Sequence, residues 1–286
     1  MKVVRTIADV RAAVRAARAS GESVGFVPTM GWFHEGHLSL MRRARSQCGF
    51  VVASLFVNPT QFNDPADLAA YPRDEARDAR MAEGAGVDLL FAPEPSELYP
   101  PGFATTVSVT GVSEPLEGAQ RGPGHFRGVA TVVAKLLNIV APDVAYFGQK
   151  DAQQALVIRR MVRDLDIPVT IEVCPTVRES DGLAMSSRNV RLGADDRVRA
   201  LALKRGLDAA AAAVRAGERD AAAVERTGRD AMRDAGVEPE YFAVVSADTL
   251  APFEDGAPLA GELLVLVAAP VGPVRLIDNL LLEAGR

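Results

Sequence analysis

The sequence predicts a doubly wound α/β domain followed by a smaller α+β domain. Through the first two thirds, apolar runs rich in β-branched residues alternate with segments of helical spacing, which is typical of a parallel sheet covered by helices on both faces. After about residue 176, two helical segments are followed by three strand-like runs. We therefore expect a first domain over residues 1–176 and a second, smaller domain over residues 177–286.

The first domain is expected to contain five principal strands separated by amphipathic helices, several of which end near Gly or Pro. The strands are expected at 23–29, 50–58, 87–93, 143–148 and 169–174, and the helices at 38–48, 73–85, 128–140 and 151–164. The run "TTVSVTG" (105–111) predicts a peripheral strand. Residues 59–72 contain three prolines and no clear period, which favours a loop that could act as a lid.

The second domain is expected to begin with two Ala-rich helices within residues 194–236, broken near Ala216–Gly217. Alanine is the best helix former, so its abundance there needs no functional explanation. Strands are then expected at 241–247, 261–270 and 274–280.

Composition excludes several classes of protein. The 286 residues carry a formal net charge of −5, so there is no basic footprint for nucleic acid. The N-terminal segment lacks the apolar core of a signal peptide, and no stretch is apolar for long enough to span a bilayer. Cys48 and Cys174 stand alone, so neither a zinc knuckle nor a disulfide framework is indicated. We expect a cytoplasmic protein that binds neither nucleic acid nor a membrane.

The segment "PTMGWFHEGH" (28–37) places His34 and His37 between the first predicted strand and the helix that follows it. The carboxyl end of a strand in an open α/β sheet is where such folds bind ligands, and a helix start attracts anions. A zinc-protease helix requires histidines four residues apart, whereas these are three apart with a glycine between them. A metal site is therefore disfavoured, leaving a phosphate site or two histidines that only cap the helix.

Two further segments offer groups that bind phosphate or ribose. In "YFGQKDAQQ" (146–154), Lys150 and Asp151 follow an apolar strand and Gly148; a lysine can pair with phosphates, and a carboxylate can accept hydrogen bonds from ribose hydroxyls. In "VRESDGLAMSSRN" (177–189), two hydroxyls precede a guanidinium, and both groups donate hydrogen bonds to phosphate. Taken singly, the first segment favours an ordinary solvated cap pair and the second an ordinary loop.

Together these segments resemble the HxGH nucleotidyltransferase superfamily, which includes the class I aminoacyl-tRNA synthetases, and within it the pantothenate synthetase family. Seven segments carry the resemblance, in the family's order and over nearly the whole chain: "PTMGWFHEGH" (28–37), "FVNPTQF" (56–62), "YPRD" (71–74), "GHFRGV" (124–129), "FGQKD" (147–151), "PTVRESDGLAMSSRN" (175–189) and "RLIDN" (275–279). The departures, Trp32–Phe33 and "DAQQ" in place of "DYQQ", affect no polar role.

The resemblance implies a Rossmann-like catalytic domain and a ligase that condenses pantoate with β-alanine through a pantoyl adenylate, releasing AMP and pyrophosphate. It assigns the phosphate role to His34, His37, Lys150, Ser186, Ser187 and Arg188. It places the backbone amide of Met30 at the reaction centre, Gly148 and Asp151 on ribose, backbone near Val177 on adenine, Gln61 and Gln154 on pantoate, and Asn58 and His125 along the pocket. It further implies Mg²⁺ held by ATP phosphates with no metal ligand from the protein, a homodimer, and a second domain that contributes the Ser-Ser-Arg loop and covers the site.

The residue chemistry fits this scheme on its own terms. Adenylation needs charge stabilisation and aligned reactants rather than a protein nucleophile, and the chain offers no convincing catalytic Cys or Ser triad. The alternatives are a nucleotidyltransferase that stops after nucleotide transfer, a tRNA synthetase, and a non-catalytic nucleotide-binding module. The acidic balance disfavours the synthetase, and the presence of every candidate phosphate contact disfavours the non-catalytic module.

Overall fold

The computed structural model describes residues 1–63, 65–254 and 256–285 and contains two compact units. Unit 1 comprises the described residues of Met1–Gln149 and Gln153–Pro175, and unit 2 comprises Lys150–Ala152 and the described residues from Thr176 onward. The sequence placed its domain boundary between residues 176 and 177. The role expected of each domain in catalysis stays a prediction.

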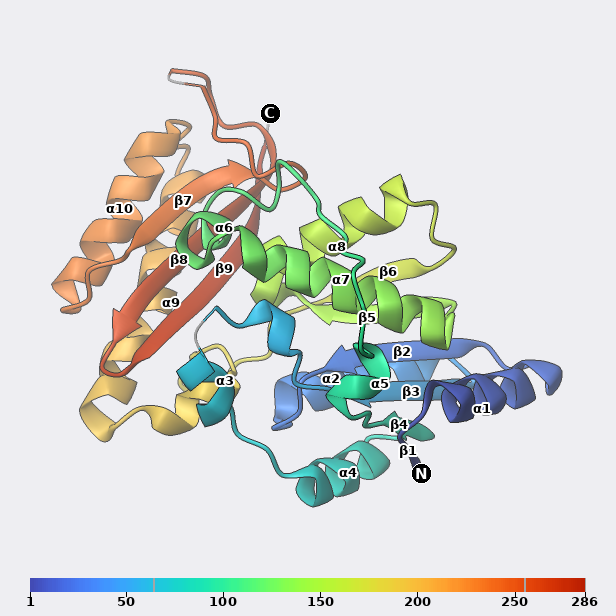
Figure 1. Ribbon diagram of the computed structural model, residues 1–286. Coiled ribbons are helices and arrows are strands. Elements are labelled where there is room, and N and C mark those ends of the chain that lie inside the picture. The colour runs from blue at the N-terminus through green and yellow to red at the C-terminus, as the bar shows by residue number, and fades with distance from the viewer. Residues whose placement is uncertain (64, 255, 286) are drawn as a thin grey trace. The chain divides into compact units, whose positions relative to one another are not determined.

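Unit 1 is built on a six-stranded parallel sheet, which confirms the predicted α/β class (Figure 1). Its strand order is β1-β4-β3-β2-β5-β6. The strands are β1 (Lys2–Val4), β2 (Val24–Thr29), β3 (Phe50–Leu55), β4 (Leu89–Phe91), β5 (Val144–Gly148) and β6 (Thr170–Cys174). All five predicted principal strands are present, and the short edge strand β1 is additional.

Helices connect these strands. The longer ones are α1 (Ile7–Ala19), α2 (Glu35–Gln47), α4 (Glu75–Gly84), α7 (Pro123–Val140) and α8 (Ala152–Asp164). The short ones are α3 (Pro65–Ala70), α5 (Pro95–Leu98) and α6 (Glu117–Arg121), with 3₁₀ turns η1 (Pro59–Gln61) and η2 (Gln149–Asp151). The four predicted helices correspond to α2, α4, α7 and α8.

Alternate strand residues pack against different helices. Val27, Val51 and Ala53 belong to the apolar cluster that includes α2 and α4, whereas Phe26 and Val52, one position along, are equally buried outside that cluster. Side chains alternate across a strand, so both faces of the sheet are covered. This explains why the strands read as continuous apolar runs in the sequence.

The strand order reverses between β2 and β5, which pair directly with Gly25 opposite Val144. The chain continues from β2 to β3 on one side and from β5 to β6 on the other. Such a switch point opens a crevice at the carboxyl ends of the strands, where open α/β sheets bind ligands. The segments that follow β2 and β5 are "MGWFHEGH" and "QKD", two of the three predicted to carry chemistry.

Two predictions about unit 1 were wrong. Residues 105–111 form no strand: the Val107 N–H donates to Thr131 Oγ1 of α7 instead of to a neighbouring strand. Residues 59–72 are not simply a loop, because η1 and α3 lie within them, each beginning with a proline that the first turn of a helix tolerates. Both elements are too short to show a period. Asp64 lies outside the described residues, and closure of this segment over a ligand stays a prediction.

Unit 2 combines helices and an antiparallel sheet, as predicted. Helices α9 (Ala194–Arg215) and α10 (Ala221–Asp234) pack together and against β7 (Tyr241–Ser246), β8 (Gly261–Val271) and β9 (Val274–Ala284), preceded by the 3₁₀ turn η3 (Ser187–Arg191) (Figure 1). Helix α10 packs so closely on the sheet at Gly228 that a Cβ there would lie 2.1 Å from the Phe242 ring. A two-residue turn with Gly272 at φ 54° joins β8 to β9.

Among the helices of residues 1–63, 65–254 and 256–285, none combines the length and the apolar character that crossing a bilayer requires.

Candidate functional site

His34 and His37 cap the start of α2 in unit 1. His34 is the N-cap residue, and its Nδ1 accepts a hydrogen bond from the Gly36 N–H at 3.1 Å. Three residues on, His37 Nδ1 accepts the His34 N–H at 3.4 Å. The three-residue spacing that is wrong for a zinc helix is therefore the spacing of a capping box, in which the N-cap and third helical residues serve each other's backbone.

The cap fixes the tautomer of both imidazoles. An Nδ1 that accepts a hydrogen bond carries no proton, so a neutral ring must carry its proton on Nε2. The two rings lie with centroids 4.2 Å apart. Both rings lie at the positive end of the α2 dipole, next to the switch point of the sheet. This site can bind an anion while both histidines also serve as caps.

A strained turn carries the chain from β2 into this cap. Gly31 has φ 86° and Trp32 has φ 51°, which for a bulky residue such as Trp is an outlier. Asp78 of α4 holds the turn: its carboxylate accepts the Trp32 N–H at 2.6 Å and the Phe33 N–H at 2.8 Å. Asp78 is 1% exposed. Strain of this kind persists only where the surroundings fix the backbone, and here a buried carboxylate does so.

Arg77 completes the clamp on the turn. Its guanidinium donates to the Phe33 carbonyl at 2.7 Å and to Asp78 Oδ1 at 3.1 Å, and it lies 4.9 Å from the centre of the Trp32 ring. Burial raises the pKa of Asp78, although hydrogen bonds from Phe33 and Trp32 and the charge of Arg77 act in the opposite direction. Neither residue was predicted from the sequence, since nothing local to residues 73–85 indicates a partner in another segment.

Four predicted residues form a second group in unit 1. Gln61 donates from Nε2 to Met30 Sδ at 3.0 Å and accepts from Asn58 Nδ2 at 3.1 Å. His125 Nδ1 lies 2.9 Å from the Gln61 carbonyl oxygen. The structure thus brings together Met30, which directly follows β2, with Asn58, Gln61 and His125.

Asn58 is the hub of this group. It is 1% exposed, and its Oδ1 accepts from Thr60 Oγ1 at 2.9 Å and from the Tyr99 hydroxyl at 2.8 Å. Its Nδ2 also donates to the Gly128 carbonyl at 3.1 Å. A Cβ on Gly128 would lie 2.4 Å from the Thr60 carbonyl oxygen, so only glycine permits α7 to approach η1 this closely. Asn58 therefore holds the segment in shape, a role the sequence did not reveal.

Two adjacent glutamines at the start of α8 differ in whether their side chains form hydrogen bonds. Gln153 is buried, accepts the Glu117 N–H at 3.0 Å and donates to the carbonyls of Val112 and Pro115. Gln154, the residue predicted to bind pantoate, is half-buried, and among the described residues its side chain makes no hydrogen bond. Its amide can therefore serve a ligand. Gly148, predicted to meet ribose, ends β5.

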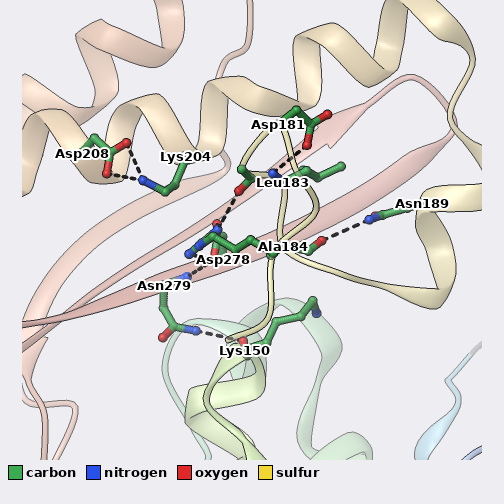
Figure 2. A network of polar contacts seen from close by, with 11 residues as sticks. Lys150, Asp181, Leu183, Ala184, Asn189, Lys204, Asp208, Asp278 and Asn279 are labelled. Atoms are coloured by element: carbon green, nitrogen blue, oxygen red, sulfur yellow. Dashed lines mark hydrogen bonds and ion pairs between the residues drawn. The ribbon is translucent and has the colours of Figure 1, made fainter. Parts of the chain in front are cut away.

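In unit 2, Lys150 and Asp151 form an ion pair. Lys150 Nζ lies 3.6 Å from Asp151 Oδ1, with the lysine side chain 20% exposed and the aspartate 50%. The pair matches the simpler interpretation left open by the sequence, and an exposed pair of this kind contributes little stability. The Lys150 carbonyl accepts a hydrogen bond from Asn279 Nδ2 at 2.9 Å (Figure 2).

The remaining predicted residues of unit 2 lie on one loop, residues 177–189. The Met185 N–H donates to the Val177 carbonyl at 3.0 Å, which closes the loop, and Ser186 Oγ accepts the Arg188 N–H at 3.2 Å as the cap of η3. Val177, Ser186, Ser187 and Arg188 are thus brought onto one short ordered segment. All four are half-buried.

Polar side chains from α9 and β9 hold this loop. Arg197 of α9 donates to Glu179 at 2.7 and 2.9 Å and to Asp181 at 2.7 Å. Arg178 makes two hydrogen bonds to Asp278 of β9, at 2.6 and 3.0 Å. The signal in the sequence is "RLIDN" (275–279), a polar pair inside an apolar strand, which carries the family resemblance but indicates no role for Asp278 or Asn279.

No metal centre is formed by the described residues. Among them, no three His, Cys, Asp or Glu side chains cluster in a way that could hold a metal ion. The free thiols Cys48 and Cys174 are buried. Burial is the main cause that raises the pKa of Cys174, to about 11, so this thiol is poorly suited to act as a thiolate nucleophile.

These features define an α/β enzyme with an HxGH helix start at the ligand-binding edge of a parallel sheet. Comparison with known proteins narrows the class: the model of the family "Pantoate-beta-alanine ligase" matches residues 2–281. A pantothenate synthetase of Cereibacter sphaeroides is 57% identical over 279 residues, covering 97% of this chain and 98% of the relative.

Solved structures give the same result. The crystal structure of pantothenate synthetase from Thermus thermophilus has a TM-score of 0.91 at 50% identity, covering 98% of this chain and 99% of the other. The Francisella tularensis pantoate-β-alanine ligase, complexed with βγ-ATP and β-alanine, has a TM-score of 0.80 at 34% identity, covering 98% and 97%. The chain belongs to the pantoate-β-alanine ligase family and is an enzyme that joins pantoate to β-alanine.

Proposed function

We propose that this ligase works in two steps at the expense of ATP. In the first, a carboxylate oxygen of pantoate attacks the α-phosphorus of ATP, and the bond to pyrophosphate breaks to give pantoyl adenylate. In the second, the amine of β-alanine attacks the acyl carbon, loses a proton and expels AMP. No protein nucleophile is required, because the substrate carboxylate fills that role.

The capped pair of histidines carries the proposal. The Nδ1 atoms of His34 and His37 cap the start of α2, and their Nε2–H groups are proposed to donate to the phosphates, where such donors stabilise charge that develops on a transferring phosphoryl group. Lys150, Ser186, Ser187 and Arg188 are proposed to supply the remaining charge and hydrogen bonds to the phosphates.

Positioning of the substrates is proposed for the other predicted residues. Gln61 Nε2 now donates to the Met30 thioether, a weak acceptor, so exchanging it for a pantoate oxygen costs little. Gln154 has an unengaged amide for the same substrate. The Met30 N–H is proposed to face the reacting phosphate, and His125 and Asn58 to shape the pocket beside Gln61.

For the nucleotide, we propose that Gly148 and Asp151 contact ribose and that the backbone near Val177 contacts adenine. The Val177 carbonyl already accepts the Met185 N–H, so adenine recognition there would use neighbouring backbone groups. The Francisella relative, complexed with βγ-ATP and β-alanine, supports a nucleotide and an amine substrate for this chain as well.

Mg²⁺ is proposed to reach the site with ATP. Mg²⁺ prefers oxygen ligands and keeps several waters, and the nitrogen donors of His34 and His37 do not match that preference. The described residues contain no acidic cluster that would hold it independently. When bound, it would neutralise phosphate charge.

We further propose a cytoplasmic homodimer, with a first domain (1–176) that binds ATP and pantoate and a second (177–286) that covers the site.

Product analysis tests the proposal. The protein is supplied with pantoate, β-alanine and Mg-ATP, with each omitted in turn, and nucleotide products are separated by chromatography. We expect sustained AMP formation only when all are present, with one pyrophosphate and one pantothenate per AMP. Formation of ADP in place of AMP would exclude the adenylate mechanism.

A further inference from the structure

Two consecutive residues of β9 are polar and buried. Asp278 is 4% exposed and Asn279 is 3% exposed, within a strand that is otherwise largely apolar. Consecutive side chains of a strand point to opposite faces, so the two side chains can hold different segments of the unit. A link between them exists as well, because the Asn279 N–H lies 2.8 Å from Asp278 Oδ1. Figure 2 shows both residues and the contacts that radiate from them.

Asn279 holds the backbone of Lys150. Its Nδ2 donates to the Lys150 carbonyl at 2.9 Å, across 129 positions of sequence and from a different element of the same unit. This contact leaves the side-chain rotamers of Lys150 unrestricted but restrains the backbone from which the side chain extends. The hydrogen bond sets the point and the direction from which the Lys150 side chain leaves the chain.

Asp278 holds the loop of residues 177–189 through Arg178. The guanidinium donates to both carboxylate oxygens, at 2.6 and 3.0 Å, and also to the Gly182 carbonyl at 3.1 Å. The two-point geometry fixes orientation as well as distance. Arg178 directly follows Val177, so the same contact fixes one strand of the loop that ends at Ser186.

A largely buried ion pair is a poor source of net stability, because desolvation offsets most of its attraction. Its value lies in geometry, since few arrangements satisfy a fork of donors on a carboxylate. Both segments held by β9 carry residues assigned to the nucleotide.

We propose that Asp278 and Asn279 are the positioning residues of the adenylation reaction in unit 2, with Asn279 acting through Lys150 and Asp278 through Arg178 on the 177–189 loop. The inference rests on the proposed function, because it assumes that Lys150 and the loop contact ATP. A purely structural role for the pair would stabilise the unit without affecting how these residues meet the nucleotide.

A double-mutant cycle separates the two roles. Asn279→Ala, Lys150→Ala and the double variant are compared in single-turnover formation of pantoyl adenylate and pyrophosphate. We expect Asn279→Ala to slow adenylation by about 10- to 100-fold, the scale of a misplaced reacting group. In the Lys150→Ala background the same change should cost less than about threefold. Additive losses would overturn the proposal, since residues that act as a unit are non-additive.

A second variant covers the possibility of impaired folding. Arg178→Lys keeps the positive charge but loses the two-point contact with Asp278. We expect the KM for ATP to rise about tenfold while the KM for β-alanine stays within about twofold. A parallel rise in both constants, or no change in either, would contradict the role assigned to Asp278.

The matched control is Glu225→Ala. Glu225 of α10 also hydrogen-bonds a backbone group of another element in unit 2, accepting the Val244 N–H at 2.9 Å. It should lower Tm to a degree similar to Asn279→Ala while adenylation stays within about twofold of the unsubstituted protein. An equal loss of rate in Glu225→Ala and Asn279→Ala would show a general effect of stability and would overturn the positioning role of Asn279.

If the unsubstituted protein forms no AMP, the proposed function itself fails. That result is distinct from additive losses in the double-mutant cycle, which would overturn only the positioning role.

Discussion

The two units hold their candidate phosphate-binding residues in different ways. In unit 1, His34 and His37 are oriented by hydrogen bonds that their own imidazoles make to the backbone of α2. In unit 2, it is the backbone of Lys150 and of the 177–189 loop that is held, by Asn279 and by Arg178 with Asp278. One unit fixes side chains directly, and the other fixes the points from which side chains extend.

The difference follows from the side chains. An imidazole has two rotatable bonds and two nitrogens, so Nδ1 can cap the helix while Nε2 remains the donor for a ligand. A lysine or arginine has four or more torsions and no spare acceptor, so only its backbone can be anchored without occupying its charge. In both units a buried carboxylate does the anchoring: Asp78 on backbone N–H groups and Asp278 on a guanidinium.

The largest effect should come from removing a charge that contacts the phosphates. Lys150→Ala is expected to lower the rate of adenylate formation by about 10²–10³-fold, by analogy with loss of one oxyanion-hole donor. Tm should change little, because the pair with Asp151 is a partly exposed contact at 3.6 Å. Single-turnover kinetics and thermal unfolding measure the two quantities on the same preparation.

Lys204→Ala is the control for this variant. It removes another lysine of unit 2 that pairs with an aspartate, Asp208, on the partly exposed surface of α9. Its rate should stay within about twofold of the unsubstituted protein. A Tm loss in Lys150→Ala that accounts for its rate loss would instead favour the simple ion-pair interpretation and weaken the contrast between the units.

A smaller effect is expected from the support in unit 1. Asp78→Asn replaces one of the two carboxylate oxygens with an NH₂ group, which cannot accept a hydrogen bond. In either orientation of the amide, this NH₂ group faces a donor, either a backbone N–H of the turn or Arg77. The free energy of unfolding should fall by roughly 1–3 kcal/mol, toward the lower end because burial already raises the pKa of Asp78 and so disfavours its charged form. Adenylation should slow by about tenfold as the histidine turn relaxes.

Glu75→Gln serves as the matched change in the same helix. Its carboxylate pairs with Arg5 at the surface, and we expect both stability and rate to stay near those of the unsubstituted protein. Denaturant unfolding and AMP formation are the measurements. If Asp78→Asn loses stability without losing rate, the strained turn at Trp32 is structural and His34 and His37 do not depend on it.

Features of the fold that are local in sequence could be predicted, and those set by distant contacts could not. The apolar run before His34 and the helical spacing after it predicted the strand-to-helix junction correctly. The helix was expected to begin at residue 38 but begins at Glu35, because histidines and a glycine contribute a cap rather than helical periodicity. The positive φ of Trp32 has no sequence signature, since it is imposed by Asp78 from another helix.

The same reasoning applies to unit 2. The three strands were predicted, yet β9 was expected to end at residue 280 and continues to Ala284, where it remains paired with β8 through Gly261 opposite Ala284. Asp278 is buried by pairing with Arg178, 100 positions away, and such partners cannot be identified from spacing. The grouping of Lys150 with Asn279 likewise depends on tertiary structure. Sequence therefore indicated which residues carry chemistry more readily than which residues hold them in place.

The smallest predicted effect is a loss of local stability at low pH, which should differ between the 177–189 loop of unit 2 and the turn held by Asp78 in unit 1. Hydrogen bonds from Arg197 are the main cause that lowers the pKa of Glu179, and the Leu183 N–H is the main cause that lowers the pKa of Asp181. A carboxylate with a lowered folded-state pKa stabilises the fold above its unfolded pKa of about 4, and this stabilisation is lost as the pH falls through the folded value. The 177–189 loop should therefore loosen as the pH falls below about 4.

Asp78 responds with the opposite sign, because its pKa is raised by burial: a group that holds its proton more tightly in the folded state favours folding more as the pH falls. Hydrogen-exchange protection of the Met185 amide, corrected for intrinsic rate, should therefore fall in acid before that of the Phe33 amide. The β7–β8 ladder provides internal reference amides. Glu179→Gln should reduce the acid sensitivity at Met185, since its amide has no charge to lose. Equal acid sensitivity of Met185 in the unsubstituted protein and in Glu179→Gln would mean that the loop is anchored by Asp278 and Arg178 alone.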